Sequence, residues 1–342
     1  MDRLFRRQLC VALVALTGCF FLPAQSIGAP EKGLKKVRYH ETARSVSYAA
    51  SYVAVAKGFF AQEGLDVDLQ TTLGSDKVMA ALLSGNADVA LTGPEFPIYI
   101  WHGKSPVKVK IICSLVAKDP MLLVRRGQSE NGFKWSDLKQ KRVLGWRQGS
   151  TPTMFLNAAL RNNGLDPGAD VKVDDNVGVA ARYGAFIANV AEYGIFFEPD
   201  ASRLQREGQG KIVASIGEEV GAVDFTLFSV TDEFLKKHPD IVQAWVNGIY
   251  RAQRWIKSSS KDQIADVLAP YFPGIAREDL LSSIERHLDK KLWNENPVVG
   301  PEFLRKFEDI LIAGKSLQPN QYMKYEDLVD RRFADKAVET VR

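Results

Sequence analysis

The sequence predicts an α/β protein made of two lobes, and three observations support this prediction. Strand-like and helix-like segments alternate from Val37 onward. The alternation restarts after residue 116, which indicates a second α/β unit. The chain has 342 residues, a length that exceeds one small core and suits two packed domains.

The first unit follows a strand–helix–strand–helix–strand order. Its strand-like segments are VRYHE (37–41), DVDLQTT (66–72) and ADVALT (87–92), and its helix-like segments are 47–64 and 75–86. Crossover helices of this length return the chain to the same end of a sheet, so the strands are expected to run parallel. Their carboxyl ends then meet at one edge, where open parallel sheets bind ligands.

The second unit begins after the strand-like segment VKVKIICSLV (107–116). Further strands are predicted in 120–127, 135–146, 171–177, 193–200 and 210–217. The turn Gly149-Ser150-Thr151-Pro152 precedes an apolar-periodic helix, with Ser150 or Thr151 as the cap and Pro152 in the first turn. Beyond Phe225 the pattern is helical, in 232–260, 260–272, 277–290 and 301–317.

The first 30 residues have the order of a secretory signal: a basic start, an apolar stretch from Leu9 to Leu22, and small residues before Pro30. The apolar stretch is shorter than the roughly 20 residues of a membrane-spanning helix. We expect a signal peptide over 1–28 and a periplasmic or extracytoplasmic protein. Cleavage before Cys19, with lipid anchoring through that residue, is the alternative. Cys113 is expected to be a buried strand residue.

Composition excludes several classes of function. The formal charge is +4, and Lys and Arg alternate with acids along the chain, so a nucleic-acid surface is not expected. The four histidines are widely separated and form no metal motif. The segment GSTPTMF lacks the second glycine of a nucleophile elbow. We therefore predict no catalytic residue, no metal and no cofactor.

The segment from YVAVAKGFF to ALTGPE (52–95) resembles the NMT1/THI5-like (SsuA/THI5-like) solute-binding proteins of ABC importers. The likeness continues through GSTP, FFEP, WVNGIYRAQRWI and KYEDLVDRRFADKA. The resemblance implies a type II periplasmic binding protein fold, with two lobes joined by a hinge that the chain crosses twice. Lobe I is expected to comprise 34–117 and 222–342, and lobe II 118–221. An ABC permease in the inner membrane is the implied partner, and a monomer is expected.

Acidic residues follow two of the predicted strands. Glu95 either accepts a hydrogen bond from the solute or is an acid favoured by a helix dipole. Glu198 follows three apolar residues and needs a partner if it is buried. That partner is either the solute or an arginine of the chain, for instance Arg147 or Arg182.

Arg147 and the turn that follows it offer a guanidinium, two hydroxyls and the free amides of a helix start, which together suit an anion; simple capping is the alternative. Tyr48 and Phe225 are favoured over Trp101 and Trp146 as stacking surfaces, because both lie near expected loop edges. The candidate ligand-binding residues are Thr42, Tyr48, Gly74, Ser75, Gly93, Glu95, Arg147, Gly149, Ser150, Thr151, Asn176, Glu198 and Phe225.

The favoured function is capture of a small organic solute by hinge closure, with a thiamine-pyrimidine-like or other heteroaromatic solute ahead of other classes. Two acids in the cleft suit a solute with N–H donors and would repel a pure oxyanion. A receptor for a sulfonate, a carboxylate or a nitrate-like anion is the alternative. An enzyme is a weaker alternative. The eukaryotic relatives in the resembled family make the thiamine pyrimidine, but their cysteine-rich motif is absent from this sequence. A sensory module of the same fold is also weak.

Overall fold

Two five-stranded sheets organise the computed structural model, which describes residues 33–103, 105–128 and 131–342. Leu34–Arg342 form one compact body, which is described below. The predicted signal peptide lies outside the described residues. The strands are β1 (Lys35–Glu41), β2 (Leu65–Thr71), β3 (Val89–Thr92), β4 (Val109–Val116), β5 (Leu122–Arg126), β6 (Arg142–Leu144), β7 (Lys172–Asp174), β8 (Tyr193–Phe196), β9 (Gly210–Ser215) and β10 (Thr226–Thr231).

The two sheets share one plan. The first has the order β2-β1-β3-β10-β4 and the second β7-β6-β8-β5-β9. In each, the first three strands are parallel, and the fourth runs antiparallel to both of its neighbours. The chain passes from the first sheet to the second between Val116 and Leu122 and returns between Ser215 and Thr226. The predicted α/β fold with two lobes is thus confirmed.

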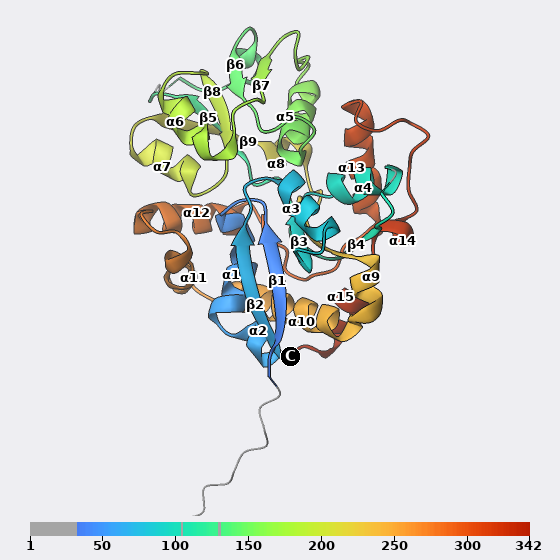
Figure 1. The fold of residues 1–342 in the computed structure, drawn as a ribbon. Coiled ribbons are helices and arrows are strands. Elements are labelled where there is room, and N and C mark those ends of the chain that lie inside the picture. The colour runs from blue at the N-terminus through green and yellow to red at the C-terminus, as the bar shows by residue number, and fades with distance from the viewer. Residues whose placement is uncertain (1–32, 104, 129–130) are drawn as a thin grey trace, which may run out of the picture. The chain divides into compact units, whose positions relative to one another are not determined.

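Helices flank both sheets (Figure 1). The 3-10 turns are η1 (Val46–Tyr48), η2 (Trp135–Leu138), η3 (Val179–Ala181) and η4 (Ala269–Tyr271). The α-helices are α1 (Ala49–Ala56), α2 (Phe59–Gln62), α3 (Ser75–Leu83), α4 (Glu95–His102), α5 (Thr151–Asn162), α6 (Arg182–Ile187), α7 (Asp200–Arg206), α8 (Ile216–Val220), α9 (Asp232–Lys237), α10 (Pro239–Ser258), α11 (Lys261–Leu268), α12 (Arg277–Asp289), α13 (Pro301–Ala313), α14 (Tyr325–Leu328) and α15 (Arg332–Thr340).

The prediction for the chain beyond Phe225 was incomplete, because a strand, β10, precedes the helices. Two predicted helices are also divided. Gly58, with φ of 68°, separates α1 from α2. His238 separates α9 from α10, and Pro239 begins α10, since proline lacks the N–H that a continuing helix needs but is accepted in the first turn.

The core of the first sheet forms against α10, the longest of the described helices. Its Trp245 is fully buried and contacts Tyr39 of β1, Phe60 of α2 and Phe228 of β10, with ring centroids 5.1, 4.5 and 5.3 Å away. A side chain at Gly248 would meet the Phe60 ring at 2.6 Å, so glycine permits this close packing. Cys113 is a buried, free residue of β4, as predicted.

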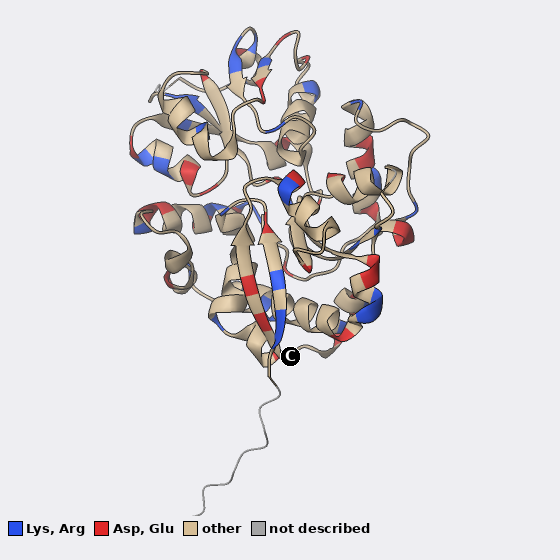
Figure 2. Ribbon diagram, in the orientation of Figure 1, with Lys and Arg blue, Asp and Glu red and all other residues tan. Residues whose placement is uncertain are grey.

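Basic and acidic residues are interspersed over the ribbon (Figure 2). On β1 and β2 they face one another across the parallel pair, where Lys36 is in register with Asp66 and Arg38 with Asp68. Opposite charges at such positions favour this register. Within the described residues, no helix is long and apolar enough to cross a membrane.

Helices from the C-terminal part of the chain contact both sheet units. The helix α12 contacts α7, and α13 contacts α5, as Figure 1 also shows. Arg206 of α7 donates from Nε and Nη2 to the two carboxylate oxygens of Asp279 in α12, each at 2.9 Å. These contacts hold the ends of the two sheets toward each other around the site described next.

Candidate ligand-binding site

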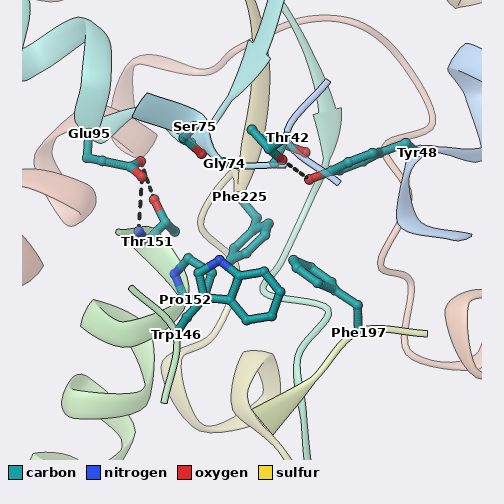
Figure 3. A pocket seen from close by; sticks show the side chains of 12 residues that line it. Thr42, Tyr48, Gly74, Ser75, Glu95, Trp146, Thr151, Pro152, Phe197 and Phe225 are labelled. Atoms are coloured by element: carbon teal, nitrogen blue, oxygen red, sulfur yellow. Dashed lines mark hydrogen bonds between the residues drawn. The ribbon is translucent and has the colours of Figure 1, made fainter. Parts of the chain in front are cut away.

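Loops at the strand ends of both sheets enclose a small chamber, which we call the central cavity (Figure 3). Eight of the thirteen predicted residues line it: Thr42, Tyr48, Gly74, Ser75, Gly93, Glu95, Thr151 and Phe225. Trp146, Pro152, Phe197 and Thr226 complete the lining. Its volume, counted as space open to the centre of a water-sized sphere, is about 20 Å³. This is room for about one water molecule, so the structure represents a closed arrangement.

Aromatic rings from both sheet units form much of this lining. Trp146 follows β6, and its ring meets that of Phe197 edge-on, with centroids 5.2 Å apart. The Phe197 ring lies 6.1 Å from that of Phe225, which precedes β10. On the opposite side, the Tyr48 hydroxyl is hydrogen-bonded to the Thr42 hydroxyl at 2.9 Å. The arrangement presents ring faces and edges together with few polar groups.

Glu95 connects the two sheet units. It occupies the first turn of α4, and its carboxylate accepts from the backbone N–H of Thr151, at 3.0 Å, and from the Thr151 hydroxyl. Thr151 begins α5, so one carboxylate lies at two helix N-termini, where a negative charge is favourable. Burial nevertheless raises the pKa of Glu95 to about 7, and the Thr151 hydrogen bonds oppose this rise. The predicted cap, Ser150, instead donates to the Arg147 carbonyl at 2.5 Å.

Two glycines let the chain segments approach closely at this junction. A Cβ at Gly93 would collide with the carboxylate of Glu95 and the hydroxyl of Thr151. Gly74 has φ of 140°, and its amide donates to the Thr42 carbonyl at 2.9 Å. A Cβ there would meet the guanidinium of Arg147 at 2.5 Å. Both positions therefore require glycine for the closed arrangement.

Five predicted residues lie outside the central cavity, and four of them belong to Arg147 and its surroundings. Arg147 donates from Nη2 to Asp76 at 2.8 Å, and both side chains are more than a third exposed. The Gly149 carbonyl accepts from the Tyr99 hydroxyl at 3.2 Å. Ser150 is buried beside them, and Asn176 lines an open surface depression that also includes Arg147. Of the proposed anion-binding turn, only Thr151 lines the central cavity with the aromatic residues, whereas Arg147, Gly149 and Ser150 do not.

Glu198 is the fifth, and it is almost fully buried. Its carboxylate accepts from the Ser202 amide and hydroxyl, each at 2.9 Å, and from the Arg286 guanidinium of α12. Burial raises the pKa of Glu198, and the charge of Arg286 opposes the rise. The arginine partner is thus Arg286, and neither Arg147 nor Arg182 fills that role. The pair joins the end of β8 to a C-terminal helix.

A second chamber, which we call the side cavity, adjoins the central cavity. Its volume on the same measure is about 270 Å³. Trp146 and Phe197 line both chambers. Glu198, Arg44 and Arg182 contribute polar groups to the side cavity. The two aromatic side chains therefore form a wall between the chambers.

A family model described as "NMT1/THI5 like" matches residues 45–261. The chain is also 34% identical over 330 residues to YtlA of Bacillus subtilis (strain 168), a protein named for a proposed role in binding; the match covers 96% of this chain and 98% of YtlA. The chain belongs to the NMT1/THI5-like family. The resemblance noted in the sequence is thereby confirmed.

Solved structures support the fold of this NMT1/THI5-like protein. The nitrate-binding protein NrtA of Synechocystis PCC 6803 aligns with a TM-score of 0.74 and 16% identity, covering 90% of this chain and 89% of NrtA. The alkanesulfonate-binding protein SsuA of Xanthomonas axonopodis pv. citri, bound to MOPS, aligns with a TM-score of 0.69 and 16% identity, covering 89% and 100%. The chain thus has the periplasmic binding protein fold. Together with the family match and the likeness to YtlA, this makes it a solute-binding protein of the kind that serves ABC importers.

Sequence reasoning did not select four residues that line the central cavity. Phe197 directly precedes Glu198 at the end of β8, so the strand-end rule that selected Glu198 applies equally to its neighbour. The sequence favours Tyr48 over Trp146 as a stacking surface, although Trp146 follows β6. Pro152 carries only the signal of a helix start, and Thr226 lies in β10, which the sequence does not predict. Ligand contact by any of the thirteen candidates stays a prediction.

Proposed function

We propose that this NMT1/THI5-like protein captures a small, flat heteroaromatic solute between two lobes and delivers it to an ABC permease. Lobe I comprises 34–117 and 222–342, and lobe II comprises 118–221. The observation that carries the proposal is the aromatic lining of the central cavity, to which Tyr48, Trp146, Phe197 and Phe225 contribute from both sheets. Aromatic side chains in offset or edge-to-face contact favour a planar ring as their partner.

Glu95 supports a solute with N–H donors, as an aminopyrimidine has. The two carboxylate oxygens of an ionised glutamate offer about four acceptor positions in all. Thr151 uses one position on each oxygen, at the N–H and the hydroxyl. Each oxygen retains a position for a donor on the solute. A solute that donates there would satisfy a buried carboxylate, whereas an oxyanion would meet like charge.

Closure is part of the proposal, because the central cavity in the closed structure admits about one water molecule. A heteroaromatic ring enters only when the lobes separate. Opening would break the contacts between the two lobes, which are Glu95 with Thr151, Arg147 with Asp76, and Arg206 with Asp279. The two chain crossings, 117–121 and 216–225, are the proposed hinge.

The setting of this activity follows from the N-terminal sequence and the family. We propose that the signal is removed, that the mature protein is extracytoplasmic and monomeric, and that the permease lies in the inner membrane. Fractionation of the native host tests the location. Uncleaved protein in the cytoplasm would contradict it, and palmitate labelling that Cys19→Ser abolishes would identify a lipid-anchored form.

The decisive experiment is a thermal-shift screen of the mature protein against 4-amino-5-hydroxymethyl-2-methylpyrimidine, nicotinamide, ethanesulfonate and nitrate. We expect the heteroaromatic compounds to raise the melting temperature. Trp146→Ala should remove that effect, whereas Trp255→Ala, a half-buried tryptophan of α10 outside both cavities, should retain it. Scattering with the bound compound should show compaction.

Other outcomes of the same screen select other functions. Stabilisation by ethanesulfonate or nitrate alone, unaffected by Trp146→Ala, would contradict the heteroaromatic proposal and favour an anion receptor. Chemical turnover of the pyrimidine would instead indicate an enzyme.

A further inference from the structure

The carboxylate of Glu95 is held by the first residue of α5 in the way that a free oxyanion would be held (Figure 3). One carboxylate oxygen accepts from the Thr151 backbone N–H at 3.0 Å, and the other accepts from the Thr151 hydroxyl. Hydrogen bonds to an ionised acceptor are the stronger class in proteins. The acid belongs to α4, which follows β3 of the first sheet, and the donors belong to α5, which follows β6 of the second. The contact is that of an anion with its binding site, with the anion tethered to the opposite sheet unit.

The start of α5 leaves the two donors of Thr151 for this contact. Pro152 has no N–H to offer, and the N–H of Met154 donates to the Ser150 carbonyl at 3.1 Å. The Ser150 hydroxyl donates to the Arg147 carbonyl at 2.5 Å. The field of the aligned peptides in this 12-residue helix favours a negative charge at its start. Thr151 therefore supplies a matched pair of donors, an N–H and a hydroxyl, to one carboxylate.

The carboxylate and the donors depend on each other. Both residues are 1% exposed. Burial raises the pKa of Glu95, and hydrogen-bond donors, with no Lys, Arg or His of the described residues among them, oppose the rise. A buried carboxylate without a cation needs such donors. The buried N–H and hydroxyl of Thr151 in turn need an acceptor, so removing the carboxylate would leave a vacant place for another one.

Little space remains beside the bound carboxylate. A Cβ at Gly93 would overlap both the carboxylate and the Thr151 hydroxyl. The central cavity as a whole has room for about one water molecule, at about 20 Å³. A free oxyanion that approached Thr151 would also meet the charge of Glu95. Volume and charge together exclude free oxyanions from the start of α5.

We propose that Glu95 determines specificity by filling a latent anion site at the start of α5 with its own carboxylate. While the side chain is in place, solutes with N–H donors reach the free positions of its oxygens, and free oxyanions do not reach Thr151. Glu95→Ala removes the equivalent of one acetate ion, so acetate or nitrate should then bind to the Thr151 donors. The inference rests on the proposed function in one respect, that solutes enter the central cavity. The latent site itself depends only on Glu95 and Thr151.

Chemical rescue of Glu95→Ala by acetate tests the inference. Melting temperatures are compared in sodium acetate and sodium chloride at equal ionic strength and pH 8, above the pKa of about 7 of Glu95. The gain in acetate over chloride should be larger for Glu95→Ala than for the wild type, by about 2 °C or more. The matched control is Glu339→Ala, which removes an exposed acid of α15 and should behave as the wild type does.

Two more variants test the parts of the site. In Glu95→Ala with Thr151→Val, the valine keeps the shape of the side chain and removes the hydroxyl. Titration calorimetry should show acetate binding about 10- to 100-fold more weakly than in Glu95→Ala alone, the range expected for one hydrogen bond to a charged group. Glu95→Gln keeps the position filled and should gain no acetate response.

The remaining outcomes separate this inference from the proposed function. An acetate response of the wild type or of Glu95→Gln equal to that of Glu95→Ala would overturn the inference, because the side chain would then not fill the site. Should Glu95→Ala not fold in chloride, acetate is expected to restore folded protein, and its failure to do so would also overturn the inference. These results leave the heteroaromatic receptor to its own screen. Rescue by acetate, with no heteroaromatic compound stabilising the wild type, would uphold the latent site and contradict the proposed function.

Discussion

Replacement of Glu95 by glutamine should change how stability depends on pH. The carboxylate is fully buried, lies at the start of both α4 and α5, and accepts two hydrogen bonds from Thr151. Burial raises its pKa from 4.5 to about 7. Glutamine preserves the shape and an acceptor oxygen but does not titrate. The variant therefore isolates the ionisation of this one side chain.

The direction and size of the effect follow from the two pKa values. From pH 5 to about pH 7 the folded protein retains a proton on Glu95 that the unfolded chain has released, and it releases this proton as the pH approaches 8. Stability therefore falls as pH rises through this range. Integration from pH 5 to pH 8, with pKa values of 4.5 in the unfolded chain and about 7 in the folded protein, gives a loss of about 2 to 3 kcal/mol. Glu41, whose pKa burial also raises to about 7, contributes equally to wild type and variant.

Urea unfolding at pH 5, 6, 7 and 8 measures this difference. The free energy of unfolding of the wild type, minus that of Glu95→Gln, should decrease by about 2 to 3 kcal/mol from pH 5 to pH 8. Glu339→Gln, a change at an exposed acid of α15, should leave the wild-type profile unchanged. Parallel profiles for wild type and Glu95→Gln would refute the reasoning, as would a difference that increases with pH.

Three further changes test the contacts between the units. Arg286→Met leaves Glu198 buried without its cationic partner and should lower the free energy of unfolding by about 3 to 5 kcal/mol. Adding Glu198→Gln should recover part of this lost stability. Unchanged stability of Arg286→Met would contradict the assigned pair. Arg147→Ala or Asp76→Ala should change the free energy of unfolding by about 1 kcal/mol or less, because this pair is exposed. A larger loss of stability in urea unfolding would show that the pair has a structural role. In Gly93→Ala the added methyl group should overlap Glu95 and Thr151, so the lobes should stay apart and solute binding should weaken at least about tenfold. Scattering of this variant should show no compaction when solute is added. Compaction equal to that of the wild type would contradict the closed geometry.

The fold was readable from the sequence wherever the hydrophobic pattern was long or repeated. Nine of the ten described strands lie in segments predicted as strands. The exception, β10, is six residues long and leads directly into α9. Its last residue, Thr231, is also the cap of that helix and accepts from the Phe234 amide at 3.1 Å. With no Gly or Pro between strand and helix, the boundary carries no turn signal.

The sequence predicted residues of the candidate site where they follow a strand, but not the distant residues that pair with them. The rule that ligands gather at the carboxyl ends of parallel strands selected Thr42, Gly74 and Glu95 correctly as lining residues. The rule does not say which distant residue pairs with a buried charge. Arg286 is 88 positions from Glu198, in a helix that carries several other charged residues. Thr151 likewise carries the signal of a helix start, and only the packed structure shows that its donors serve Glu95.

The placement of β10 between β3 and β4 has a consequence for the order of folding. A chain made from its N-terminus presents β1, β2, β3 and β4 long before residues 226–231 arrive, because all of 117–225 intervenes. Until then β3 and β4 lack the neighbour that joins them, and such long-range pairing forms slowly. The sheet begun first is therefore completed last. Until residues 226–231 are made, one edge of β3 and one edge of β4 therefore remain without the strand that covers them.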